Sequence, residues 1–477
     1  MAQSNRRKGP RFSLALAAGK FTAKALNLIG REGGQLPGVI AEKICPDFLG
    51  RIDTPEHLVF VTGSNGKTTT TNLIADLLVA CGQDPLINRV GGNIDTGIAS
   101  TLLKSSTAGG HARKQNAVLE LDERSARTVF PYITPDVLVV TNLYRDTFTR
   151  NAHVDYVADI LSRYIPTGCK LVLNADDMIS ARLAPENHNR VYFSLCPVPA
   201  DTPQPDDIVL DLTACPECGG HLSYEYVHLG HIGRLTCDNC GLTNPPADFE
   251  AIAVNYDEQL ITVRENREPG TPAYDYHFSA GSVTDLYNLL GAIVAARLVG
   301  LAPQQIQEAL LGGVGVVKSR YSEKVVAGRR IVNIASKGEN GMACSRGFAN
   351  IKREPGDKAV VLMIEDYYKA KDADSTEFCG WFYETDFEYL ADPSVRQIVV
   401  AGVRSEDMIL RMLLAGIDPA VMVQAKDGAE AADLVDWRNA KTIYYSHAIH
   451  NEYPAEESRD RLIARIQRET AGEEVHA

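Results

Sequence analysis

The segment that most constrains the fold is a glycine-rich stretch near residue 65. An apolar run, Leu58–Val61, leads into Gly63–Thr70, with the sequence GSNGKTTT, and a helical pattern continues to about Ala80. Glycines in such a turn let backbone N–H groups close on phosphate oxygens, and the helix N-terminus adds its positive dipole end. Strand, loop and helix in this order favour a phosphate-binding loop over a chance Gly-Lys-Thr in an ordinary turn.

The loop predicts ATP and Mg²⁺ as ligands. Lys67 is expected to reach the β- and γ-phosphates, and the Thr68 hydroxyl is expected to hold the metal ion. The general motif has a glycine where this chain has Val61, so the match is to a shorter G-x-x-G-K-T form. The nucleotide-binding residues predicted in this loop are Gly63, Ser64, Asn65, Gly66, Lys67, Thr68 and Thr69.

Short apolar runs alternate with helical patterns on both sides of a glycine-rich linker at 312–315. The runs at 117–121, 137–141, 171–173 and 191–194 precede the linker, and those at 331–334, 360–364, 397–401 and 442–445 come after it. Strands that alternate with helices predict an α/β fold with a mostly parallel, doubly wound sheet. We therefore expect an N-terminal helical segment at 1–55 that packs on an ATP-binding domain at 56–312, and a smaller α/β domain at 316–477.

Four of the ten cysteines form two C-x-x-C pairs, Cys215/Cys218 and Cys237/Cys240, each followed by glycine. This spacing is typical of a zinc ribbon, here an insertion at about 206–248, in which four thiolates hold a closed, structural Zn²⁺. Redox pairs or free thiols are the alternative. The three histidines between the pairs are not needed by a complete four-cysteine set. The other thiols are scattered without a pairing rhythm, which indicates a reducing cytoplasm.

The net charge, the absence of long apolar runs and the N-terminal sequence argue against a nucleic-acid-binding, a membrane-spanning and a secreted protein. Lys and Arg number 48 against 61 Asp and Glu, a net charge of −13 over 477 residues that argues against nucleic-acid binding. No apolar run approaches the roughly 18 residues of a membrane span. Arg6 and Arg7 precede a short apolar stretch, but lysines interrupt the sequence after it, so a secretory signal fits poorly. A basic amphipathic helix fits better, with Phe12, Leu16, Phe21, Leu26 and Ile29 as its apolar residues, and leaves light contact with an anionic membrane surface open.

Three further segments come after the loop in a recognisable order. They are Leu119–Glu123 (LELDE), Thr141–Asp146 (TNLYRD) and Leu173–Asp177 (LNADD). With the short phosphate loop they resemble the Mur ligases. The resemblance implies that Glu120 holds Mg²⁺ together with Thr68, and that Lys67 and Glu120 are catalytic. It also implies nucleotide contacts from Asn142, Asp285, Asn288 and Arg320.

The cysteine insertion and the C-terminal half, including the segment Gly380–Glu388 (GWFYETDFE), resemble one group of this family, the MurT synthetase subunits. That resemblance implies ATP-dependent amidation of the D-Glu α-carboxylate of the lipid II stem peptide, by way of an acyl phosphate. Ammonia would come from a GatD-like glutamine amidotransferase on the C-terminal domain, and lipid II would be met at the inner membrane surface. The chain departs from the group's pattern at Asp285, where asparagine is usual, and at Glu384, where aspartate is usual.

In the MurT group, an acid of the C-terminal domain approaches the partner's Cys–His pair. The candidates here are Asp366, Glu384 and Asp386. Two rival functions are a Mur-like or folylpolyglutamate-synthase-like ligase that joins an amino acid, and a non-catalytic ATP-binding scaffold. Activity without a glutaminase partner would favour the first, and the presence of Lys67, Thr68 and Glu120 argues against the second.

Overall fold

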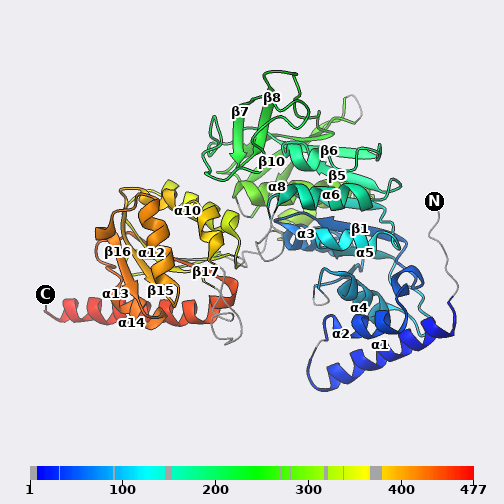
Figure 1. Ribbon diagram of the computed structural model, residues 1–477, viewed down its shortest axis with the longest axis horizontal. Helices are drawn as coiled ribbons and strands as arrows, with labels where there is room; N and C mark the ends of the chain where they lie inside the picture. The colour runs from blue at the N-terminus through cyan, green and yellow to red at the C-terminus, as the bar shows by residue number, and fades with distance from the viewer. Residues whose placement is uncertain are drawn as a thin grey trace. The chain divides into compact units, whose positions relative to one another are not determined.

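The computed structural model describes residues 8–31, 33–89, 92–145, 153–267, 270–279, 281–315, 321–336, 338–365 and 379–476 (Figure 1). The chain divides into two compact units. The first contains the described residues up to Arg145, His153–Asp206 and those from Asp211 to residue 315. The second contains Asp207–Leu210 and the described residues from 321 onward. None of the helices in the described ranges combines the length and apolar character that a membrane crossing needs.

A twisted sheet forms the centre of the first unit. Its described strands are in the order β11-β10-β9-β6-β5-β4-β1-β3-β2, and pairing is parallel from β2 through to β9. β10 pairs antiparallel with both β9 and the edge strand β11. The bounds are β1 His57–Thr62, β2 Leu86–Ile87, β3 Asn116–Glu120, β4 Val137–Val140, β5 Lys170–Asn174, β6 Arg190–Leu195, β9 Phe249–Asn255, β10 Leu260–Glu265 and β11 Ala273–His277.

Helices cover both faces of this sheet, as the alternating pattern predicted. In β1, Leu58 and Phe60 face a core shared with α4, α5 and α6, whereas the intervening residues face the side on which α3 and α8 pack together. The helices are α1 Pro10–Leu28, α2 Leu36–Ile44, α3 Lys67–Ala80, α4 Asp95–Ser105, α5 Ala126–Val129, α6 Val154–Tyr164, α7 Met178–Ala181, α8 Val283–Leu298 and α9 Pro303–Leu311. The doubly wound α/β fold is therefore confirmed.

The N-terminal helices α1 and α2 pack on α4 and extend the same core. Phe12 stacks on Phe48 with ring centroids 5.3 Å apart, and Leu16 is buried beside them. The predicted apolar residues of α1 do not share one buried face, however, because Phe21 and Ile29 are exposed. Only the side of α1 that meets α2 and α4 is covered.

The cysteine-containing insertion lies between β6 and β9. It forms a two-stranded antiparallel hairpin from β7 (Leu222–Leu229) and β8 (Ile232–Cys237), separate from the main sheet. Its small apolar core contains Cys215, Leu222, Leu235 and Cys237, and also Met178 of α7. The hairpin is therefore packed against the end of β5 in the first unit.

The second unit repeats the layered arrangement around a smaller sheet of order β12-β13-β17-β14-β15-β16, parallel except for the edge strand β12. Residues of α10 and α12 contribute to the core on one face, and residues of α13 and α14 to the core on the other. The bounds are β12 Tyr321–Val326, β13 Arg329–Ser336, β14 Lys358–Met363, β15 Val395–Ala401, β16 Met422–Ala425, β17 Thr442–Ala448, α10 Gly341–Arg353, α12 Ser405–Leu414, α13 Gly428–Leu434 and α14 Glu452–His476.

The close crossing of α2 and α4 yields a stability prediction. A Cβ atom on Gly38 would overlap the backbone carbonyl of Thr96, and the Gly38 N–H donates to Ser100 Oγ at 2.7 Å. Gly38→Ala must separate the helices, so we expect it to destabilise the first unit by about 1–3 kcal/mol and to lower the Tm seen by circular dichroism. Gly9→Ala is the control, since its Cβ would meet open space. Equal Tm values for the two variants would contradict the packing described here.

Candidate functional site

The glycine-rich loop lies at the carboxyl end of β1 and is tightly confined. Gly63 and Gly66 both have positive φ angles, 125° and 84°. A Cβ on Gly63 would overlap the Thr141 hydroxyl at the end of β4, and one on Gly66 would overlap the Asn288 side chain on α8. Glycine is needed at both positions because of the backbone angle and because of the close approach.

Asn142, predicted as a nucleotide contact, holds the loop itself. Its Oδ1 accepts from the N–H of Asn65 at 3.1 Å, and its Nδ2 donates to the Asn65 carbonyl at 3.1 Å. The Asn142 carbonyl accepts from Ser64 N–H at 2.8 Å, and Thr141 Oγ1 donates to the Asn65 carbonyl at 2.7 Å. Two adjacent residues after β4 thus fix the loop conformation by pairing its backbone.

Lys67 begins α3 and forms a buried ion pair with Glu123. Its Nζ lies 2.6 Å from Glu123 Oε1 and also donates to the Gly63 carbonyl. Burial alone would lower the pKa of Lys67, but the neighbouring carboxylates, Glu123 first, outweigh it and raise that pKa. The lysine is therefore held as a cation, aligned by the loop. Glu123 was not among the predicted site residues, although it belongs to the quoted acidic segment.

Thr68 and Glu120 come together beside this lysine, as the sequence predicted. Thr68 Oγ1 donates to Glu120 Oε2 at 2.7 Å, and Asn93 Nδ2 donates to Glu120 Oε1 at 2.9 Å. The Glu120 backbone is fixed in turn by Asn88, whose Oδ1 accepts from Glu120 N–H at 2.8 Å. A hydroxyl and a carboxylate oxygen in contact suit a hard divalent cation such as Mg²⁺, which prefers oxygen ligands.

The four remaining predicted nucleotide residues are Asn288, Asp285, Thr69 and Arg320. Asn288 is buried in α8 against the loop, where its Oδ1 accepts from Thr70 Oγ1 at 3.4 Å. Asp285 lies in the first turn of the same helix and pairs with the N-cap residue Ser282, which donates to it at 2.5 Å. Thr69 comes directly after Thr68 in the first turn of α3. Arg320 lies outside the described residues.

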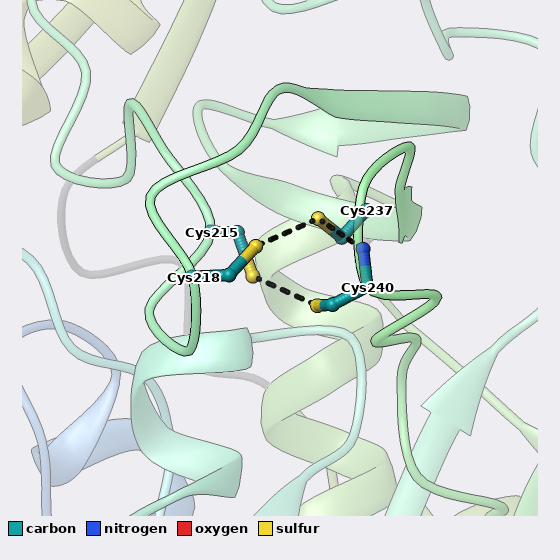
Figure 2. Close-up of side chains that lie close together, drawn as sticks. All are labelled: Cys215, Cys218, Cys237 and Cys240. Carbon is teal, nitrogen blue, oxygen red and sulfur yellow. Dashed lines mark hydrogen bonds between the residues drawn. The ribbon is translucent and has the colours of Figure 1, made fainter.

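Four cysteine sulfurs converge at the end of the hairpin (Figure 2). The Sγ atoms of Cys215 and Cys240 are 3.6 Å apart, as are those of Cys218 and Cys237, and all four lie within 4.8 Å of one another. Tetrahedral Zn²⁺ with Zn–S bonds of about 2.3 Å places its sulfurs roughly 3.8 Å apart. Gly219 and Gly241, the residues directly after the two pairs, have φ angles of 70° and 73°. The donor set thus fits a structural zinc ion.

The hairpin is hydrogen-bonded to the strand end that carries Asp176 and Asp177. Gly233 N–H donates to the Asp176 carbonyl at 2.9 Å, and buried His231 donates from Nε2 to Asp177 Oδ1 at 3.1 Å. The side chain of Asp176 accepts from Tyr287 of α8 at 2.8 Å, and its pKa is raised to about 6 by burial. The LNADD segment therefore anchors the insertion.

The same contacts continue to the phosphate loop. Asp177 Oδ2 accepts from Leu143 N–H at 2.8 Å, and the Tyr144 ring contacts the His231 ring at a tilt of 53°, with ring centroids 4.7 Å apart. Tyr144 N–H then donates to Ser64 Oγ at 2.8 Å, and Ser64 Oγ donates to the Tyr144 carbonyl at the same distance. A connected chain runs from the hairpin through His231 and residues 143–144 to the loop. Sequence reasoning set His231 aside because the cysteines already completed a metal site.

The acids predicted in the C-terminal domain belong to the second unit. Asp386 is buried, accepts from Ile208 N–H at 2.9 Å, and has its pKa raised to about 7, chiefly by burial. Glu384 is half-buried at the end of the 3₁₀ turn Gly380–Glu384. Asp366 lies outside the described residues. The structure therefore brings Lys67, Thr68 and Glu120 together, with Asn142 and Asn288 beside them.

Comparison with known proteins agrees with this geometry. Residues 61–200 match the Mur ligase middle domain and residues 338–449 match the MurT ligase C-terminal domain. The lipid II isoglutaminyl synthase (glutamine-hydrolyzing) subunit MurT of Staphylococcus aureus (strain COL) is 30% identical over 89% of this chain and 92% of its own length. The corresponding subunit of Streptococcus pneumoniae (strain ATCC BAA-255 / R6) is 28% identical over 91% and 93%.

Solved structures show the same fold. A pseudomurein peptide ligase type C from Methanothermus fervidus has a TM-score of 0.62 and 18% identity, covering 87% of this chain and 80% of its own. The fold, the short phosphate loop and the adjoining acids together define a ligase of the Mur class. Within that class, the match over both halves of the chain shows that it belongs to the MurT family.

The Lys67–Glu123 pair gives a testable consequence. Removing one partner of a buried ion pair leaves an uncompensated charge and costs about 3–5 kcal/mol. We expect Glu123→Gln to lower the Tm of the nucleotide-free protein, and to increase the further rise in Tm that ADP with Mg²⁺ produces, because phosphate supplies the missing counter-charge. Differential scanning fluorimetry with and without nucleotide measures both.

The control is Asp159→Asn in α6, which removes an exposed ion pair with Arg163 and is expected to leave the Tm nearly unchanged. A Glu123→Gln protein with the wild-type Tm and the wild-type response to ADP would show that Glu123 does not hold Lys67.

Proposed function

We propose that this chain is the synthetase subunit of a lipid II isoglutaminyl synthase. It amidates the α-carboxylate of D-Glu in the lipid II stem peptide to give D-isoglutamine. The observation that carries the proposal is the cluster of Lys67, Thr68 and Glu120 around the phosphate loop, in a chain whose MurT relatives match it over about nine-tenths of its length. ATP is the phosphoryl donor.

The proposed reaction divides a difficult amide synthesis into two steps. An oxygen of the D-Glu α-carboxylate takes the γ-phosphoryl group of ATP, and ADP leaves. Ammonia then attacks the carbonyl carbon of the acyl phosphate, after which phosphate and a proton leave and the amide remains. Bound Mg²⁺ would neutralise charge that develops on the transferred phosphoryl group.

The chain's own residues position and stabilise these groups. Lys67 is cationic and already ordered, so it can exchange Glu123 for phosphate oxygens without a large rearrangement. Thr68 and Glu120 would hold Mg²⁺, and the backbone N–H groups of the loop would face phosphate at the start of α3. Asn142 and Asn288 act by fixing the loop.

A separate GatD-like subunit would supply ammonia by hydrolysing glutamine. The names of the curated relatives, each called a subunit of a glutamine-hydrolyzing enzyme, support this part. Cys344 is consistent with this part, because burial raises the pKa of its thiol to about 11 and makes this one thiol a poor nucleophile. Asp366, Glu384 and Asp386 remain our candidates for the acid that meets the partner's Cys–His pair, and Asp386 would need to be uncovered to do so.

The insertion would bind one structural Zn²⁺ through Cys215, Cys218, Cys237 and Cys240. The convergence of all four sulfurs supports zinc over two independent redox pairs, because the short S···S contacts join the two C-x-x-C motifs. The site is closed by four thiolates and offers no open position for substrate. We place the enzyme in the cytoplasm, where scattered thiols such as Cys45, Cys81 and Cys169 stay reduced.

The test of the function is mass spectrometry of lipid II incubated with the full chain, ATP, Mg²⁺ and ammonium in place of the partner. We expect conversion of one carboxylic acid to an amide, and its loss in Lys67→Ala. Lys426→Ala, an exposed lysine in the second unit, is the matched control and should retain activity. ATP consumption without an amide, or addition of an amino acid, would overturn the proposal in favour of another ligase.

Zinc removal tests the structural role of the insertion. We expect one Zn²⁺ per chain by elemental analysis. Chelation, or Cys218→Ser with Cys240→Ser, should weaken binding of a fluorescent ADP about tenfold, because the network costs about 1–3 kcal/mol when broken. His231→Ala should weaken binding similarly with zinc retained.

His221→Ala, in an exposed ion pair with Asp238, is the matched control for His231→Ala. If chelated and zinc-loaded protein bind the nucleotide equally, the hairpin does not support the loop.

A further inference from the structure

The outward side of helix α1 carries a regular row of exposed apolar side chains. Leu14, Phe21 and Leu28 are 62%, 75% and 81% exposed. They are seven residues apart, which is close to two helical turns, so they align along one side of the helix. Phe12, Ala15, Leu16 and Gly19 lie on the buried side against the rest of the unit. In Figure 1, α1 forms the outermost layer of its unit, with α2 and α4 between it and the sheet.

Cationic residues alternate with this apolar row. Arg11 and Lys24 each lie three residues from a member of this row on α1, Arg31 follows the end of the helix three residues after Leu28, and all three are exposed. Arg11 also donates from Nε to the Ile44 carbonyl at the end of α2. The stretch from Pro10 to Arg31 contains no Asp or Glu, although the chain as a whole has a net charge of −13. We call these six residues the outer row: Arg11, Leu14, Phe21, Lys24, Leu28 and Arg31.

Other lysines near α1 point elsewhere and do not contribute. Lys8 pairs with Asp53 at 2.7 Å. Lys20 donates to the carbonyls of Leu103 and Ser106 at 2.6 and 2.7 Å, so it fastens α1 to the end of α4. These contacts fix the rotation of the helix about its axis. The outer row is therefore presented by a rigid support rather than by a loose terminal segment.

We propose that the outer row docks the first unit on the surface of an anionic phospholipid membrane. Exposed leucine and phenylalanine side chains can enter the boundary between headgroups and acyl chains, while arginine and lysine remain at the phosphate level. Each basic residue near an anionic surface adds electrostatic attraction to that surface. The apolar and the basic side chains of the outer row lie along α1 and just after its C-terminal end.

Charge complementarity favours an anionic membrane, rather than a second copy of the chain, as the binding partner of the outer row. An acidic protein is repelled by an anionic membrane except where a cationic surface faces it, and the acid-free helix provides that surface. A second copy of the chain would bring two cationic rows together, and like charges would repel. This inference rests on the proposed function in one respect: a lipid-linked substrate requires the enzyme to work at a membrane surface.

The experiment is co-sedimentation of the full chain with phosphatidylglycerol vesicles, with phosphatidylcholine vesicles as the uncharged comparison. We expect binding to the anionic vesicles to weaken as salt is added. Phe21→Ser with Leu28→Ser, and separately Lys24→Gln with Arg31→Gln, should each reduce the partition coefficient at least tenfold. Leu311→Ser is the matched control, since Leu311 is 77% exposed at the end of α9, and should bind like wild type.

Two further measurements distinguish loss of membrane binding from unfolding and from loss of the proposed activity. Unchanged Tm values would show that the outer-row variants fold, as expected for exposed positions. Amidation of detergent-solubilised lipid II should be retained in these variants, so loss of vesicle binding is separated from failure of the proposed function. Wild-type binding by both double variants, or no binding by the wild type, would overturn the proposal. So would a self-association that the variants abolish.

Discussion

The pairing of the phosphate loop with the residues just after β4 is the constraint on which the site depends. A loop that must present its N–H groups to a ligand cannot satisfy its own backbone, so neighbouring segments have to hold it. Asn142 does so by matching the donor and the acceptor of Asn65, and Thr141 adds a second bond to the same carbonyl. The two glycines with positive φ make the close approach possible. Lys67 and Thr68 take their positions from this arrangement, because they begin the helix that the loop opens.

Around the phosphate loop, one set of residues has the proposed chemical roles and a second set holds the first in position. In the proposed reaction, Lys67, Thr68 and Glu120 would supply the charge and the oxygen ligands that phosphoryl transfer requires. Glu123, Asn288 and the Asp177–His231 contact hold them from three sides: the end of β3, helix α8 and the inserted hairpin. The hairpin's cysteine cluster lies away from the loop in sequence, yet its hydrogen-bonded neighbours reach Ser64. A structural metal at that position would act on the nucleotide site only through mechanical support.

Much of this was predictable from sequence where local chemistry dominates. The predicted helix Thr68–Ala80 begins one residue earlier in the structure, at Lys67, because a glycine with positive φ defines where it starts. The four-cysteine cluster was predicted from spacing alone. The predictions were incomplete where tertiary packing decides. Strands β12 and β16 were not predicted. They lie at the two edges of the second sheet, and the sequence of β16 is half-buried and only weakly apolar, so it resembles that of a loop. Phe21 and Ile29 were predicted among the apolar residues of an amphipathic N-terminal helix, but both are exposed, because a periodic pattern does not say which side of a helix the rest of the chain covers. Glu123 was missed because its partner Lys67 is distant in sequence, and His231 was set aside as a metal ligand while its contact with the distant Asp177 could not be foreseen.

The buried Lys67–Glu123 pair also bears on selectivity among anions. A lysine that is already neutralised offers little attraction to free phosphate or pyrophosphate, since either ion must first displace a carboxylate 2.6 Å away. Only a ligand with additional binding energy from its other parts can complete that exchange. The internal carboxylate therefore works as an energetic threshold. Under the proposed function, this ion pair would favour binding of a nucleotide over binding of a small inorganic anion.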